Sequence, residues 1–246
     1  MNTTKESPCG TDRKTAIIVG VLYIIGTVAG ILSLVFTEPI LGQPDYLTLV
    51  SKNPNQIVIG ALFVLTMGLA LAMVPIMMFP ILKRYNEALA VGYVVFRGTL
   101  EAVTYLALVI GWLSLPLISQ GYIKASALDA PYFQSLGDLV LQVHDQIGHV
   151  LTIVFILGAL MFYYVLYQSR LVPRWLSGWG LLAATPYLVS GVSGLFALLS
   201  PMSTTQIVLV LPLAVQEMVL AVWLIVRGFH SSSVNFRSVE VAISRA

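Results

Sequence analysis

Long apolar segments are the feature that most constrains how this chain can fold. Six of them recur, and at a helical rise of about 1.5 Å per residue each is long enough to cross about 30 Å of hydrocarbon. None carries a polar stripe with the 3.6-residue period that marks the helices of soluble proteins. The six segments cover residues 15–37, 56–82, 87–115, 132–167, 175–199 and 205–226.

The composition agrees with this pattern. Hydrophobic residues make up 58% of the 246 residues and charged residues only 10%, whereas about a quarter of the residues of a soluble protein are charged. We therefore expect an all-α fold, a polytopic membrane bundle of six transmembrane helices whose main partner is the lipid bilayer. No glycine-rich phosphate loop and no basic stripe occurs, so no nucleic-acid partner is expected.

The basic residues fall almost entirely on one side of this predicted bundle. The other side has only Lys52 and Lys124, and loops rich in Lys and Arg face the cytoplasm. The pattern predicts a multi-pass protein of the cell membrane with both termini in the cytoplasm. The basic residues on the predicted cytoplasmic side are Lys5, Arg13, Lys14, Lys83, Arg84, Arg170, Arg174, Arg227, Arg237 and Arg245.

Polar tails flank the apolar region. We expect a polar cytoplasmic tail at residues 1–14, a six-helix transmembrane domain at 15–229 and a second polar tail at 230–246. The only cysteine, Cys9, lies in the first tail, so no intrachain disulfide can form. Each longer outer loop holds a stretch that could form a short helix, at residues 45–53 and 122–130. Aromatic residues around the fourth and fifth segments fit an interfacial belt, namely Tyr163, Tyr164, Tyr167, Trp175 and Trp179.

Two charged residues interrupt the third apolar segment, in the stretch FRGTLEAVTY. If the cytoplasmic boundary lies near Glu87, Arg97 lies about 15 Å and Glu101 about 21 Å into the hydrocarbon. They are four residues apart, so they share one helix face and can pair. A charge at the bilayer centre costs about 2.5–3.5 kcal/mol on insertion scales. We therefore expect this face to point into the bundle.

The sixth segment supplies a carboxylate at a matching depth. Glu217 lies about ten residues before Arg227, and the helical rise puts it about 15 Å from the boundary. We predict that Glu217 is the interhelical partner of Arg97, because one guanidinium has five N–H donors and can serve two carboxylates. The charge at this level is then about minus one, or zero if one carboxylate keeps its proton.

The fourth segment contains the stretch QVHDQIGHV. Counted from Tyr167, His149 lies about 27 Å along the helix, close to the outer boundary. Asp145 and His149 share a helix face, whereas His144 points elsewhere, so the two histidines are not expected to bind one ion. Together with the deeper charges, these residues form the predicted ligand-binding set: Arg97, Glu101, Asp145, His149 and Glu217.

Three functions remain open on these residues. The first is a polar pocket, open to the outer side, that binds or passes a small amphipathic or ionic molecule, including a lipid. The second is a metal-assisted intramembrane hydrolase with Asp145, His149 and Glu101 as ligands and Glu217 as base. The third is a scaffold or helper protein in which Arg97, Glu101 and Glu217 fix helix register. The sequence identifies no catalytic residue, cofactor or oligomeric state.

Three stretches resemble a bacterial and archaeal family of six-span membrane proteins known as a domain of unknown function. They are FPILKRYNEALAVGYVVFRGTLEA, LVPRWLSGWGLL and EMVLAVWLIVRGF. The resemblance covers most of the chain from the second segment onward and implies six spans. It draws attention to Arg97, Glu101, Arg174, Glu217 and Arg227, and it implies no established activity, substrate or cofactor.

Overall fold

The computed structural model describes residues 8–199 and 203–230. This part of the chain is entirely helical, as predicted, and contains no strand. Three elements, α4, η1 and α5, run on without a break, so the described residues form seven helices. The elements are α1 (Pro8–Leu41), α2 (Tyr46–Lys52), α3 (Pro54–Leu82), α4 (Glu87–Tyr93), the π-helix η1 (Val94–Leu100), α5 (Glu101–Lys124), α6 (Ala130–Ser169), α7 (Arg174–Leu195) and α8 (Thr204–Val226).

Five helices of this described part are long and apolar enough to cross a membrane. They are Asp12–Leu41, Pro54–Leu82, Glu87–Lys124, Ala130–Ser169 and Thr204–Val226. Helix α7, which corresponds to the fifth predicted segment, at residues 175–199, is not among them. It has 22 residues, and serine and glycine recur along it. The structure therefore supports a multi-pass membrane protein with at least five candidate spans.

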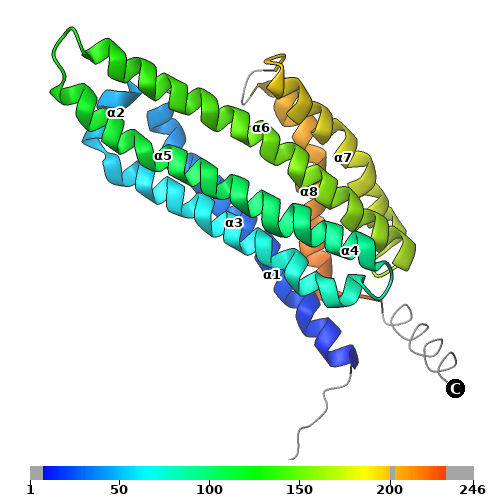
Figure 1. Cartoon of the computed structure of the whole chain (residues 1–246). Coiled ribbons are helices and arrows are strands. Elements are labelled where there is room, and N and C mark those ends of the chain that lie inside the picture. Colours follow the sequence, from blue (N-terminus) through cyan, green and yellow to red (C-terminus); the bar gives the residue numbers. More distant parts are fainter. Residues whose placement is uncertain (1–7, 200–202, 231–246) are drawn as a thin grey trace, which may run out of the picture.

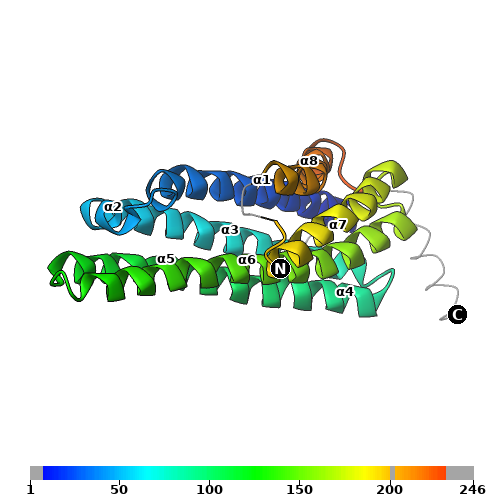
Figure 2. The same ribbon diagram turned by 90° about the horizontal axis from the view of Figure 1, so that it is seen from above.

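The six long helices form a closed ring. Contacts join α1 to α3, α3 to α5, α5 to α6, α6 to α7, α7 to α8 and α8 back to α1. Figure 1 shows α3, α5 and α6 as long, roughly parallel rods, with α7 and α8 together along one end of α6. Figure 2 shows α1 and α8 on one face of the molecule and α5 and α6 on the other. A ring of this kind shields its interior from lipid on all sides.

The connections at the end of the bundle that holds α2 differ from the prediction in one place. Helix α2 forms within the predicted stretch 45–53, and its Tyr46 donates a hydrogen bond to Asp138 Oδ1 on α6 at 2.8 Å. The second predicted short helix, at 122–130, is wrong. Helix α5 continues to Lys124 and α6 begins at Ala130, because their apolar residues pack against each other to the helix ends.

Polar contacts tie the helix ends together at the end with most of the basic residues. The Arg13 guanidinium donates to the carbonyls of Leu224, Ile225 and Val226, at 3.2, 2.7 and 3.1 Å. These carbonyls lie at the end of α8, where Leu224 O also accepts from Gly228 N at 3.2 Å, and a cation stabilises such a helix end both by hydrogen bonding and through the helix dipole. Nearby, Asp12 pairs with Arg84 at 3.0 Å. The start of α1 is thereby joined to α8 and to the residues after α3.

The predicted tails fall largely outside the description. Helix α1 begins at Pro8, seven residues before the start of the predicted transmembrane domain at Thr15. The predicted tail at 230–246 is described only at His230, and Lys5, Arg237 and Arg245 also lie outside the described residues.

Removing the Arg13 side chain is expected to destabilise the bundle. Arg13→Ala removes the side-chain donor of three terminal carbonyls of α8, of which Leu224 O keeps its bond from Gly228 N; because the contacts are partly exposed, we expect a cost of about 1–2 kcal/mol. Arg13→Lys keeps the charge but has fewer N–H donors, so its unfolding temperature is expected to lie between those of the wild type and Arg13→Ala. Thermal unfolding of the three proteins in the same neutral detergent measures the effect. Equal unfolding temperatures would show that the contact contributes nothing to stability.

Candidate functional site

Arg97 is held inside the ring by a local change in helix geometry. It lies in η1, a π-helix of seven residues between α4 and α5. Such segments are rare and are often found at functional sites. The side chain is only 2% exposed, which confirms that its face points inward. Its Nη1 donates to both carboxylate oxygens of Glu101, the first residue of α5, at 3.0 and 3.2 Å.

The second carboxylate comes from α8, as predicted. Glu217 Oε1 accepts a hydrogen bond from Arg97 Nη2 at 2.9 Å, and its side chain is 16% exposed, against 2% for Glu101. Depth matching therefore identified the interhelical partner correctly. One guanidinium faces two carboxylates, so the cluster carries a net charge of minus one when both are ionised. Glu217 is the more accessible of the two.

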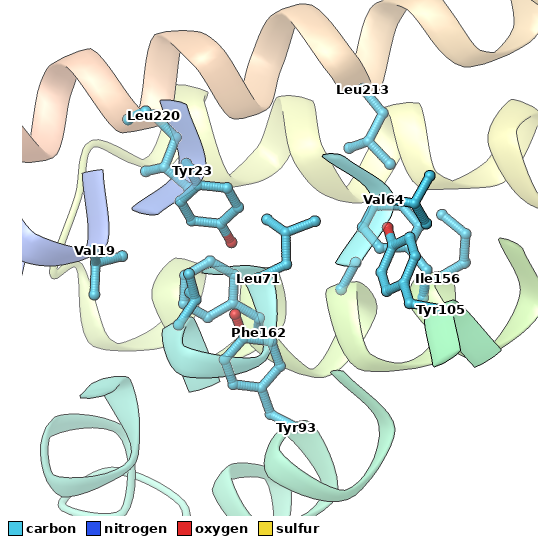
Figure 3. Close-up of a cluster of buried hydrophobic side chains, with 14 of the residues drawn as sticks. Val19, Tyr23, Val64, Leu71, Tyr93, Tyr105, Ile156, Phe162, Leu213 and Leu220 are labelled. Carbon is cyan, nitrogen blue, oxygen red and sulfur yellow. The ribbon is translucent and has the colours of Figure 1, made fainter. Parts of the chain in front are cut away.

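Aromatic rings surround the guanidinium. The ring of Phe155, from α6, lies 4.1 Å from the Arg97 guanidinium carbon, and the ring of Tyr23, from α1, lies 5.9 Å away. Both distances are within the range of cation–π attraction. Figure 3 shows Tyr23 and Tyr93 pointing their hydroxyl ends toward the same region beside Leu71. The charged cluster is thus surrounded by aromatic side chains from several helices.

A cavity of about 170 Å³ lies beside this cluster. Arg97 and Glu217 supply its charged wall, while Tyr105, Phe155 and Tyr187 supply aromatic walls. Every long helix of the ring contributes to it. The remaining lining residues are Gly26, Thr27, Met67, Leu71, Leu151 and Thr152.

Close contact between α6 and η1 fixes the Arg97 backbone. Gly158 of α6 lies against it: a Cβ at this position would be 3.1 Å from Arg97 Cβ and 3.2 Å from Arg97 N. The second of these neighbours is backbone and cannot move independently. A glycine here allows α6 to bring Phe155 over the guanidinium.

Asp145 and His149 lie in a separate pocket of about 500 Å³ between α6 and α7. His149 is 7% exposed and its ring packs directly on Gly194 of α7, whereas Asp145 is exposed. His144 faces the opposite way, with its ring stacked on Trp112 at 4.7 Å. The expectation that the two histidines point in different directions is correct.

The predicted residues therefore form two groups rather than one. Arg97 and Glu217 line the central cavity and Glu101 binds Arg97 beside it, whereas Asp145 and His149 line the pocket between α6 and α7. Within residues 8–199 and 203–230, no three His, Cys, Asp or Glu side chains are placed to hold a metal ion together. The ligand set proposed for a metal-assisted hydrolase is thus not assembled, because its members sit at different heights and on different helix faces.

A second polar network joins three helices and was not predicted. Tyr163 donates to Gln216 Oε1 at 2.7 Å, and Gln216 Nε2 donates to the carbonyl of Leu176 at 3.0 Å. Both side chains are fully buried, so the assignment of Tyr163 to an interfacial belt is wrong. Tyr164, Tyr167 and Trp175 of the predicted belt are exposed.

The sequence contains a signal for some of the site residues that the sequence analysis did not identify, the aromatic residues around Arg97. Counted along their helices from the basic boundary, Tyr23, Phe155 and Tyr187 lie at about the depth of Arg97. Aromatic residues are common in membrane helices, so depth by itself does not select these three. No comparable signal marks the π-helix or the pairing of Tyr163 with Gln216.

Enlarging Gly158 is expected to disturb the site, whereas enlarging Gly148 on the same helix is not. A valine at 158 would press on the backbone of η1, and overpacking of this kind costs about 1–3 kcal/mol. A Cβ at Gly148 meets nothing within 4 Å, which makes Gly148→Val a matched control. We expect Gly158→Val to lower the unfolding temperature in detergent and Gly148→Val to leave it almost unchanged. Equal effects would contradict the close approach.

Comparison with known proteins identifies the family. The profile of the domain of unknown function DUF4386 matches residues 18–228, which includes every residue of the central cavity. No curated protein and no solved structure matches the chain. Because the match covers most of the sequence, the chain belongs to the DUF4386 family of domains of unknown function.

Proposed function

We propose that the chain crosses the cell membrane six times, with α7 as the additional span and both termini in the cytoplasm. The start of α1 and the end of α8 lie together, since Arg13 binds the last carbonyls of α8. The end of α6 lies there too, because His230 N donates to Leu171 O at 3.0 Å. The chain must therefore return to the opposite side between α6 and α8. Helix α7, about 33 Å long by its helical rise, is the segment that does so.

Cysteine accessibility tests this topology. The natural Cys9 is expected to react with a membrane-impermeant maleimide only when the cytoplasmic side is exposed, as in inverted vesicles. In a Cys9→Ser background, Leu198→Cys lies in the exposed connection after α7 and is expected to react in intact cells. Lys83→Cys, in the same background, serves as a second cytoplasmic marker. Labelling of Leu198→Cys only from the cytoplasmic side would show that α7 does not cross.

The function that the central site supports best is reversible binding, or passage, of a small amphipathic or ionic molecule. The observation that carries this proposal is the cavity beside Arg97, Glu101 and Glu217. A cluster made only for stability would gain most from complete packing, since voids between helices sacrifice contacts. Here a charged wall faces an open volume in the middle of the bundle. Ionisable groups in this position commonly mark a ligand or ion path.

Charge favours a cation as the occupant. Two carboxylates already balance the charge of the Arg97 guanidinium, so an anion would meet a cluster with a net negative charge. Glu217 presents a carboxylate to the cavity, and the rings of Tyr105, Phe155 and Tyr187 line the other walls. Carboxylates and aromatic faces together form the kind of surface that binds organic ammonium ions. The proposed ligand is therefore a small organic cation with an apolar body.

The pocket between α6 and α7 that Asp145 and His149 line opens to the outer side in the proposed topology; this outer pocket is the proposed route to the central cavity. His149 lines the outer pocket, and Thr152, one helical turn further along α6, lines the central cavity. Asp145 adds a carboxylate at the exposed side of the outer pocket, where it would attract a cation. In this arrangement Asp145 and His149 gather the ligand, Arg97 and Glu217 face it in the central cavity, and Glu101 holds the guanidinium in place.

Ligand-induced stabilisation tests the proposal. Tetramethylammonium chloride is expected to raise the unfolding temperature of the purified protein, whereas sodium acetate at equal ionic strength is not. Glu217→Gln keeps the size of the side chain and removes the charge, so it should abolish most of the shift. Glu87 is an exposed carboxylate at the start of α4, so Glu87→Gln is the matched control, and this variant should retain the shift in unfolding temperature.

Two outcomes would overturn the cation assignment. One is an equal shift by tetramethylammonium in the wild type and in Glu217→Gln. The other is stabilisation by acetate that requires Arg97. Arg97→Ala, checked for folding, therefore accompanies both titrations, and equal shifts in wild type and Arg97→Ala would exclude any role for the guanidinium.

A scaffold function is the second candidate, because Arg97 joins η1, α5 and α8 in a way that fixes their register. Buried ion pairs can often be replaced by apolar residues without loss of stability. If the cluster serves register alone, a variant with Arg97→Met, Glu101→Leu and Glu217→Leu should fold and should retain the tetramethylammonium response of the wild type. Loss of that response in a folded variant would exclude the scaffold reading.

A further inference from the structure

A third, chemically different pocket lies at the opposite end of the bundle from α2. It has a volume of about 380 Å³ and is lined by Arg170, Val172, Pro173, Arg174 and His230. Three of these five residues carry basic side chains, and none of the described residues that line it is acidic. The basic groups come from three places in the chain: the end of α6, the start of α7 and the segment after α8. The pocket is thus assembled by the fold rather than by one charged run.

The loop that carries the first two arginines is ordered by its own contacts. Leu171 and Val172 are fully buried, and Leu171 O accepts the hydrogen bond from His230 N at 3.0 Å. Pro173 precedes α7, and its carbonyl accepts from Leu176 N at 3.0 Å and Ser177 N at 3.3 Å. These contacts fix the loop and join the segment after α8 to it. The pocket is therefore largely preformed.

Arg170 occupies a backbone conformation that usually selects a different residue. It follows the last residue of α6 with φ 57° and ψ 26°, in the left-handed region, and its N–H bonds to Leu166 O at 3.1 Å. Glycine or asparagine is preferred at such helix ends, because other residues pay about 1–2 kcal/mol for this conformation. A long cationic side chain stands here despite that cost. This favours a role for the guanidinium in the pocket.

Aromatic rings position the other two basic side chains and mark the depth of the pocket. The Arg174 guanidinium lies 5.3 Å from the centre of the Tyr167 ring. The His230 ring lies 6.2 Å from that of Trp223, which itself meets Trp175 edge-on at 6.5 Å. Exposed Tyr and Trp residues are typical of the headgroup layer of a bilayer. The pocket therefore lies where lipid phosphates are found.

We propose that this pocket is a phosphate-binding site, occupied by the phosphodiester of an anionic lipid headgroup or by free phosphate. Arginine binds phosphate oxygens through paired N–H donors, and the start of α7 adds the positive end of a helix dipole. Basic pockets between membrane helices on the cytoplasmic side bind anionic headgroups in the same way. The site is independent of the central cavity, which holds excess negative charge and favours a cation.

Binding of short-chain lipids to the full-length protein in neutral detergent tests the proposal. The probes are dihexanoyl phosphatidylglycerol, dihexanoyl phosphatidylcholine and inorganic phosphate. Arg170→Asn removes the charge and keeps a residue that tolerates the left-handed conformation, and Arg174→Gln removes the second charge. We expect each variant to raise the dissociation constant for phosphatidylglycerol at least fivefold. Lys83→Gln, a cation at the same end of the bundle but outside the pocket, should leave it unchanged.

The probes separate the two sources of phosphate. Tight phosphatidylglycerol binding that both arginine variants weaken identifies a lipid site, and the same pattern with inorganic phosphate alone identifies a site for free phosphate. Phosphatidylcholine bound as tightly as phosphatidylglycerol would overturn the proposal, because the anionic charge would then play no part. Equal weakening by Lys83→Gln would overturn it too, since general surface charge would explain the binding.

Discussion

The rest of the structure depends on a guanidinium that is kept away from lipid. Arg97 is 2% exposed and binds Glu101 and Glu217, so the charge cannot be accommodated unless η1, α5 and α8 stay together. An isolated buried charge is far more costly than a paired one. The ion pairs therefore fix the height at which α8 sits against the third long helix. Phe155 and Tyr23 add α6 and α1 to the same centre.

The closed ring of helices follows from the same requirement. A row of helices would leave one face of the charged cluster open to hydrocarbon, whereas contact of α8 with α1 completes the enclosure. Two further polar links reinforce the closure: Arg13 joins α1 to α8, and the pairing of Tyr163 with Gln216 joins α6 to α8. Packing within lipid has little hydrophobic driving force, so such links have a larger share in holding helices together. Helix α7, which is the least apolar of the six, is covered by α6 and α8.

The sequence predicted the parts of this structure that follow from the cost of placing charge in hydrocarbon. It identified the helical class, the inward face of Arg97 and the match in depth with Glu217, because each depends on little more than spacing and helical rise. It did not predict the π-helix, since a single extra residue per turn leaves no mark in an apolar pattern. It also placed Tyr163 at the membrane interface. A tyrosine can instead be buried in the bundle when its hydroxyl has one hydrogen-bond partner, and for Tyr163 this partner is Gln216. The prediction that Asp145 and His149 share one site with the central charges was wrong. Residues form one site only when both their depth in the bundle and their helix face agree.

The distribution of charge along the bundle favours one direction of entry for the proposed cationic ligand. The central cluster has one carboxylate in excess of its guanidinium, whereas the end that holds Arg170, Arg174 and His230 is basic. A cation moving toward Glu217 from the basic end would meet repulsion in a medium of low dielectric constant, where it is strong. From the other end it would first meet the carboxylate of Asp145. An anionic phosphate bound at the basic pocket would reduce that repulsion. Occupancy of one site would then alter access to the other, although the two lie at different levels of the membrane and share no residue.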